Sequence, residues 1–142
     1  MKRLVCSTTG WGMILCLVAA VSPILPWHVR GGVCASGYGD WHGPTINVIA
    51  ALGFIFLIAT SPLSPVPWWR ILGVAAVGAG VVVVVLMYAM RPGSGWMDFP
   101  VAEYGGLLAI LSAAGLLLVA ALEVRQLILK RLADSAQQKP QA

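Results

Sequence analysis

Four long stretches without a charged residue constrain this chain more than any other feature of its sequence. An α-helix rises 1.5 Å per residue, so about 20 apolar residues cross the roughly 30 Å hydrocarbon core of a bilayer. The uncharged stretches are 4–29, 41–69, 71–90 and 104–122. We therefore predict an all-α, four-span transmembrane helical bundle, with spans near 9–27, 45–61, 70–90 and 102–122.

The composition agrees with this class of protein. Of the 142 residues, 59% are hydrophobic and 10% are charged, and the mean hydropathy is +0.88. Soluble domains carry about 25% charged residues. These values exclude a soluble globular domain, a disordered chain, a collagen and a disulfide scaffold. The net charge of +4 comes from only nine cationic residues, too few for a nucleic-acid-binding surface. The expected partner is the lipid bilayer.

The first apolar stretch has an alternative interpretation as a cleaved signal peptide, because Lys2 and Arg3 precede it. Pro23 follows directly after the only small-residue cleavage motif nearby, and Leu15 is too large to precede a lipoprotein-type cysteine at position 16. We expect an uncleaved first span.

The distribution of Lys and Arg predicts the orientation. Seven of these residues fall on one side of the predicted membrane, and two, Arg30 and Arg91, fall on the other. The excess marks the cytoplasmic side. Both termini and the 62–69 loop are therefore expected in the cytoplasm, and 28–44 and 91–101 outside, in a cell (inner) membrane. The six tryptophans lie at the ends of the predicted spans, as interfacial anchors do. They are Trp11, Trp27, Trp41, Trp68, Trp69 and Trp96.

Two cytoplasmic segments need separate interpretations. Pro62-Leu63-Ser64-Pro65 predicts a stiff connector, although its spacing also fits an SH3-type ligand. After Glu123, an apolar stripe at helical spacing predicts a cytoplasmic amphipathic helical extension, which forms the last part of the 1–134 transmembrane domain. The stripe is Val124, Leu127, Ile128 and Leu132, with Arg125, Lys130 and Arg131 beside it. This extension could lie on anionic headgroups, pack on a partner, or simply end the helix. Residues 135–142 are polar and aperiodic, and we expect a disordered tail.

The first outer loop holds four weak candidates for metal ligation. They are His28, Cys34, Asp40 and His42. Their spacing matches no compact ligand pattern, so we expect residues of a solvated, glycine-rich loop, and neither a metal nor a cofactor. The three cysteines fall in three different compartments, which excludes an intramolecular disulfide.

The two outer loops share the pattern G-x-G-x4-P at 37–44 and 93–100, which indicates either a duplicated helical hairpin or a coincidence of interface residues. Three residues after each proline stands a polar residue, Asn47 or Glu103. Small residues follow six and nine positions after each proline, and the third span adds its own at four-residue spacing, so we predict faces for close helix packing. These candidates are Ala50, Gly53, Gly106, Ala109, Ala75, Ala76, Ala79 and Gly80.

No ionisable residue falls near the middle of a predicted span, where such groups usually mark transport or proton transfer. We therefore expect a non-enzymatic accessory, scaffold or assembly protein that packs against other membrane proteins or itself. The alternative is a small oligomeric transporter or channel with a shallow outer polar site. That site would consist of Asn47 and Glu103, ringed by Asp40 and Asp98. The sequence offers no combination of a nucleophile with a general base that would favour an enzyme.

Overall fold

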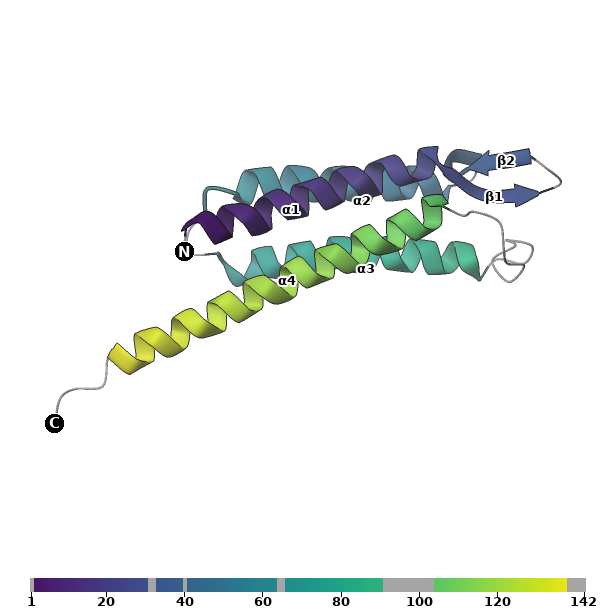
Figure 1. The fold of residues 1–142 in the computed structure, drawn as a ribbon. Helices are drawn as coiled ribbons and strands as arrows, with labels where there is room; N and C mark the ends of the chain where they lie inside the picture. Colours follow the sequence, from purple (N-terminus) through teal and green to yellow (C-terminus); the bar gives the residue numbers. More distant parts are fainter. Residues whose placement is uncertain (1, 31–32, 40, 64–65, 91–103, 138–142) are drawn as a thin grey trace.

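The computed structural model describes residues 2–30, 33–39, 41–63, 66–90 and 104–137. Its four α-helices form a bundle (Figure 1). They are α1 (Lys2–Val21), α2 (His42–Thr60), α3 (Trp68–Ala89) and α4 (Tyr104–Gln137). Between α1 and α2 lie a 3-10 turn η1 (Ser22–Ile24), strands β1 (Pro26–Arg30) and β2 (Val33–Ser36), and a second 3-10 turn η2 (Gly37–Gly39). The prediction of an apolar helical bundle is confirmed.

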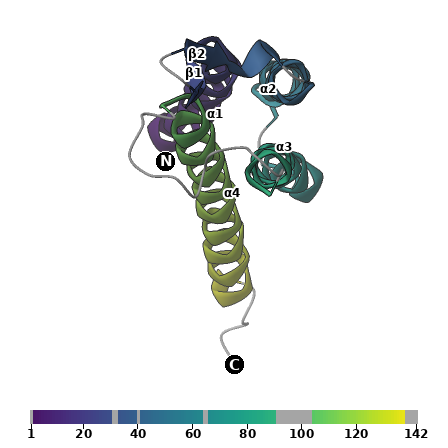
Figure 2. The same cartoon turned by 90° about the vertical axis from the view of Figure 1, so that its right-hand side faces the viewer.

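The helices pack in cyclic order, each against its two neighbours in the series α1, α2, α3, α4. Figure 2 shows this arrangement along the bundle axis. The start of α1, the connection from α2 to α3 and the far end of α4 lie at one end of the bundle, which we call the termini end (Figure 1). The two strands lie at the opposite end, the hairpin end.

Within the described residues, three helices are long and apolar enough to cross a membrane: α2, α3 and the part of α4 up to Ser135. The apolar part of α1, taken together with η1, is a shorter apolar helical segment, Thr8–Ile24. The predicted first span, near 9–27, differs from the structure because α1 ends at Val21 and the chain turns through η1 into β1. Pro23 explains this end, since it lacks the N–H that would continue the helical hydrogen bonding. The predicted fourth span corresponds to the first part of α4, which continues without a break for 34 residues.

The segment between α1 and α2 contains regular structure that the all-α prediction did not include. Strands β1 and β2 pair antiparallel, with Val29 opposite Cys34 and Arg30 opposite Val33. An irregularity in the register falls between Pro26 and His28. The hairpin brings η2 beside η1 and α2.

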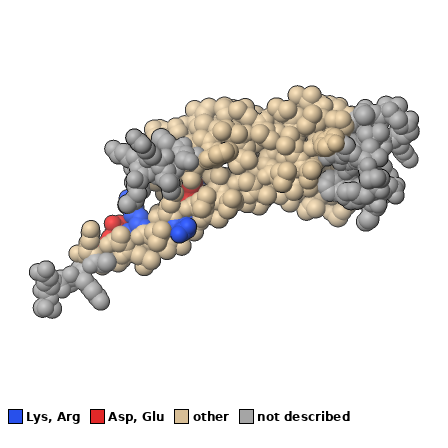
Figure 3. Space-filling model, in the orientation of Figure 1, with Lys and Arg blue, Asp and Glu red and all other residues tan. Residues whose placement is uncertain are grey.

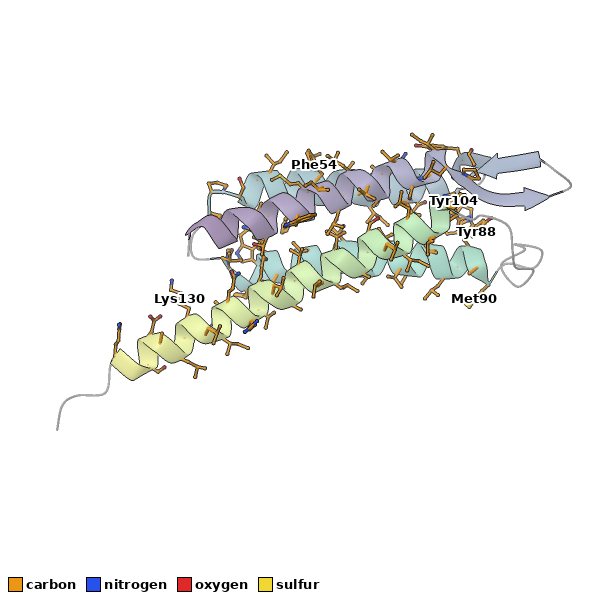
Figure 4. All side chains as sticks on the ribbon, in the orientation of Figure 1. Phe54, Tyr88, Met90, Tyr104 and Lys130 are labelled. Carbon is orange, nitrogen blue, oxygen red and sulfur yellow. The ribbon has the colours of Figure 1, made fainter. Side chains whose placement is uncertain are left out.

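The helices are apolar on their inner and outer faces alike, as in membrane-spanning bundles. One group of buried side chains, including Ile46, Val81 and Ala113, fills the core towards the hairpin end. A second group, including Cys16 and Leu116, fills it towards the termini end. Large apolar side chains also cover the outside, where Leu52 (62%), Ile55 (61%) and Leu72 (57%) are among the most exposed. Figure 4 shows these side chains along the ribbon.

Candidate functional site

A buried ion pair between Arg70 and Glu123 is the most unusual feature of the bundle. The Nη2 atom of Arg70 donates to Oε1 of Glu123 over 2.9 Å, and both side chains are completely buried. Arg70 is the third residue of α3, and Glu123 lies past the middle of α4. In the predicted topology, Arg70 begins the third span and Glu123 directly follows the fourth, so both lie at the ends of spans.

Arg70 also binds the two remaining helices. Its Nη2 atom donates to Oγ1 of Thr9 in α1 over 2.6 Å, and its Nη1 atom donates to the carbonyl oxygen of Thr60 over 3.2 Å. Thr60 is the last residue of α2, where helical carbonyl groups have no partner within the helix. One guanidinium group therefore connects α3 to each of the other three helices.

Local electrostatics explain why this position needs so many partners. A cation in the first turn of a helix is opposed by the partial positive charge of the helix N-terminus. The Glu123 carboxylate and the negative end of the α2 dipole at Thr60 offset that effect. Among the described residues, Nε of Arg70 and Oε2 of Glu123 are buried without a hydrogen-bond partner. The desolvation of both charges is thus only partly offset by the bonds that they make.

At the hairpin end, aromatic side chains form a second cluster. The rings of Trp27 and Tyr88 meet edge to face at 4.9 Å, and Nε1 of Trp27 donates to the carbonyl oxygen of Ser22 over 2.9 Å. His42 meets Tyr88 edge to face at 5.3 Å and stacks on Trp41 at 3.9 Å. Trp27 is only 1% exposed. The interpretation of Trp27 as a lipid-facing interfacial anchor is therefore wrong, because β1 turns its side chain into the core.

The predicted outer polar site is only partly within the described residues. Asn47 is half-buried in α2, and its side-chain amide donates to the hydroxyl group of Tyr38 in η2. Glu103, Asp40 and Asp98 lie outside the described residues. The proximity of Asn47 and Glu103 therefore stays a prediction.

The weak metal candidates likewise fall only partly within the described residues. His42 is buried among aromatic rings. His28 and Cys34 fall in β1 and β2, where their paired neighbours are Ala35 and Val29, and Asp40 lies outside the described residues. The backbone pairing thus places His28 and Cys34 at successive registers of the hairpin.

The predicted small-residue faces divide into two groups. Ala50 and Gly53 of α2 and Gly106 and Ala109 of α4 are buried inside the bundle. On α3, Ala76 and Ala79 are exposed, and Ala75 and Gly80 are half-buried. The close approach of α3 to α4 occurs instead at Gly78, where a Cβ atom would lie 3.1 Å from the carbonyl oxygen of Ala113.

Comparisons with protein families, with curated proteins and with solved structures find no match to this chain. The described residues form an apolar four-helix bundle with a buried polar connection at the termini end and an aromatic cluster at the hairpin end.

Proposed function

We propose that this chain is a non-enzymatic integral membrane protein of the cell membrane, with both termini in the cytoplasm, that assembles with other membrane chains. The observation that carries this proposal is the length of α4. At 1.5 Å per residue its 34 residues reach about 50 Å, whereas the hydrocarbon core measures about 30 Å. The last turns of α4 therefore extend past the hydrocarbon core, and in Figure 1 they run beyond the other helices.

This extension, which we define as residues 124–137, is unsuited to remain alone in water. Ile128 (52%), Leu129 (55%) and Leu132 (62%) are more than half exposed. Figure 4 places Lys130 beyond the ends of the other helices. In Figure 3, Lys and Arg side chains gather on this part of α4, while most of the visible bundle is tan. Apolar side chains among cations, outside the bundle, are typical of a surface that contacts another molecule.

The buried polar groups support an assembly role over transport. Arg70 and Glu123 neutralise each other and are completely buried, and Arg70 contacts all three other helices. Ionisable residues in membranes often line pathways for ions or protons. Here the pair lies within helix contacts, where it favours the arrangement of the helices that gives both charges a partner.

Purification of the tagged full-length chain in mild detergent, followed by quantitative mass spectrometry, tests the proposal. We expect at least one membrane protein, or further copies of the chain, at a stoichiometric level. The variant with Ile128→Ser and Leu132→Ser should lose that component, and the control variant Ala133→Ser should retain it. Recovery of the wild-type chain as a monomer without any protein partner would contradict the proposal.

A further inference from the structure

The outward face of α4 carries a second apolar stripe, distinct from the face that packs in the bundle. The inward face ends at Glu123, which is the last buried residue of α4 within the described part of the chain. The outward stripe continues nine residues further, to Leu132. In Figures 1 and 2, the extension runs clear of the other helices.

The outward stripe follows a heptad spacing. Its residues alternate at intervals of four and three, which is the a and d pattern of a coiled coil. All eight are exposed. We call them the α4 seam: Leu107, Leu111, Ala114, Leu118, Ala121, Arg125, Ile128 and Leu132.

We propose that the α4 seam binds the α4 seam of a second copy of this chain, as a parallel pair of helices. This inference rests on the proposed assembly function and names its partner. All copies enter the membrane in one orientation, so identical residues meet at the same depth. A two-fold axis parallel to the bilayer normal then makes the interface self-complementary.

The seam has residues suited to each environment that it crosses. Within the bilayer, apolar side chains gain little by leaving lipid, and helix association depends on close packing. Ala114 and Ala121, seven residues apart in the d positions, allow that close approach. Beyond the bundle, Ile128 and Leu132 would otherwise contact water, so their burial contributes a hydrophobic stabilisation.

The exposed apolar surface around the seam has the size of a standard interface. Four further apolar side chains flank the seam and are 38–55% exposed: Leu117, Leu122, Val124 and Leu129. Together with the five large apolar residues of the seam, which are 52–62% exposed, they offer on the order of 800 Å², about the area that each partner buries in a standard interface.

Arg125 is the one polar residue in an a position of the seam. A single polar residue at an a position reduces the stability of a coiled coil but specifies its register and number of strands. It lies two residues past Glu123, at the level where α4 leaves the bundle. Anionic headgroups at that level reduce the repulsion between two Arg125 side chains.

Disulfide cross-linking in native membranes tests this inference. The background replaces Cys6 and Cys34 by Ser and Cys16 by Ala. Leu118→Cys and Ile128→Cys place a thiol on the seam, and Lys130→Cys places an exposed thiol on the far side of the same helix. Under mild oxidation, we expect at least tenfold more cross-linked homodimer from Ile128→Cys and Leu118→Cys than from Lys130→Cys. Two differently tagged copies identify the product.

The outcomes separate this inference from the proposed function. A cross-link from Ile128→Cys to a different membrane protein would overturn the second copy as partner and leave the assembly function intact. Equal homodimer yields from Ile128→Cys and Lys130→Cys would indicate random collision and overturn the inference. A monomer without cross-links that also lacks co-purifying proteins would overturn both. Adding Leu132→Glu to the Leu118→Cys chain should reduce the homodimer at least fivefold, whereas adding Lys130→Glu should not.

Discussion

Gly105 packs its backbone directly against the indole ring of Trp27. A Cβ atom at position 105 would lie 2.3 Å from Nε1 of Trp27 and 2.6 Å from the carbonyl oxygen of Ser22. The same nitrogen and the same carbonyl form the hydrogen bond that fixes the indole. The second residue of α4 therefore packs directly against η1 and β1 at the hairpin end.

We expect Gly105→Ala to lower the free energy of unfolding by about 1–3 kcal/mol, because overpacking displaces a well-packed ring. Denaturation of the purified protein in detergent measures the change. Gly10→Ala is the matched control, since a Cβ atom at position 10 meets nothing within 4 Å and alanine favours a helix. Equal stability of Gly105→Ala and wild type would contradict the contact.

Removal of one member of the buried ion pair should be costly. We expect Glu123→Ala to destabilise the bundle by about 3–5 kcal/mol, because it leaves the Arg70 guanidinium buried without its carboxylate. Lys130→Ala, which removes an exposed cation seven residues along the same helix and away from the seam, should change stability by less than about 0.5 kcal/mol. Denaturant unfolding of both variants measures the difference.

The double variant Arg70→Met with Glu123→Leu distinguishes an ion pair from ordinary packing. Replacing both charges by apolar groups of similar size is often neutral or stabilising. We therefore expect the double variant to recover most of the stability that Glu123→Ala loses. Arg70→Met and Glu123→Leu are also measured as single variants. If the loss in the double variant equals the sum of their two losses, Arg70 and Glu123 act independently.

Helix packing within the bundle should depend on Gly78 and be insensitive to Ala76. A Cβ atom at position 78 would lie 3.2 Å from Cγ of Leu117 as well as close to the Ala113 carbonyl. We expect Gly78→Leu to cost about 1–3 kcal/mol of unfolding free energy. Ala76 is exposed, so Ala76→Leu should leave that free energy within about 0.5 kcal/mol of wild type. Thermal unfolding in detergent compares the two.

The proposed orientation has a direct test in intact cells. In a cysteine-free background, Ser36→Cys at the hairpin end should react with a membrane-impermeant thiol reagent. Gln137→Cys at the termini end should react only after the cells are opened. Both positions are exposed, so accessibility does not differ between them for local reasons. Labelling of Gln137→Cys, but not Ser36→Cys, in intact cells would reverse the orientation.

The sequence was most informative about the lengths of the helices and least informative about which way their side chains turn. The uncharged stretches predicted the helical class because hydropathy needs no knowledge of neighbours. The prediction of Trp27 as an interfacial anchor is wrong because its burial depends on Pro23, which ends α1, and on a β-hairpin that no local sequence pattern indicates. Arg70 and Glu123 were visible as opposite charges at the same end of two predicted spans. Their pairing depends on the rotation of α3 and α4, which emerges only when both helices are packed.

The position of Arg70 in the chain has a consequence for the order in which the bundle is made. Thr9 and Thr60 precede Arg70, so two of its three partner helices are synthesised before it. Glu123 follows 53 residues later, so its carboxylate is absent while α3 enters the membrane. A guanidinium without a counter-charge is costly to bury in a bilayer. We therefore expect the first three helices to hold Arg70 near the headgroups until α4 is synthesised, and the ion pair to form only when this last helix packs.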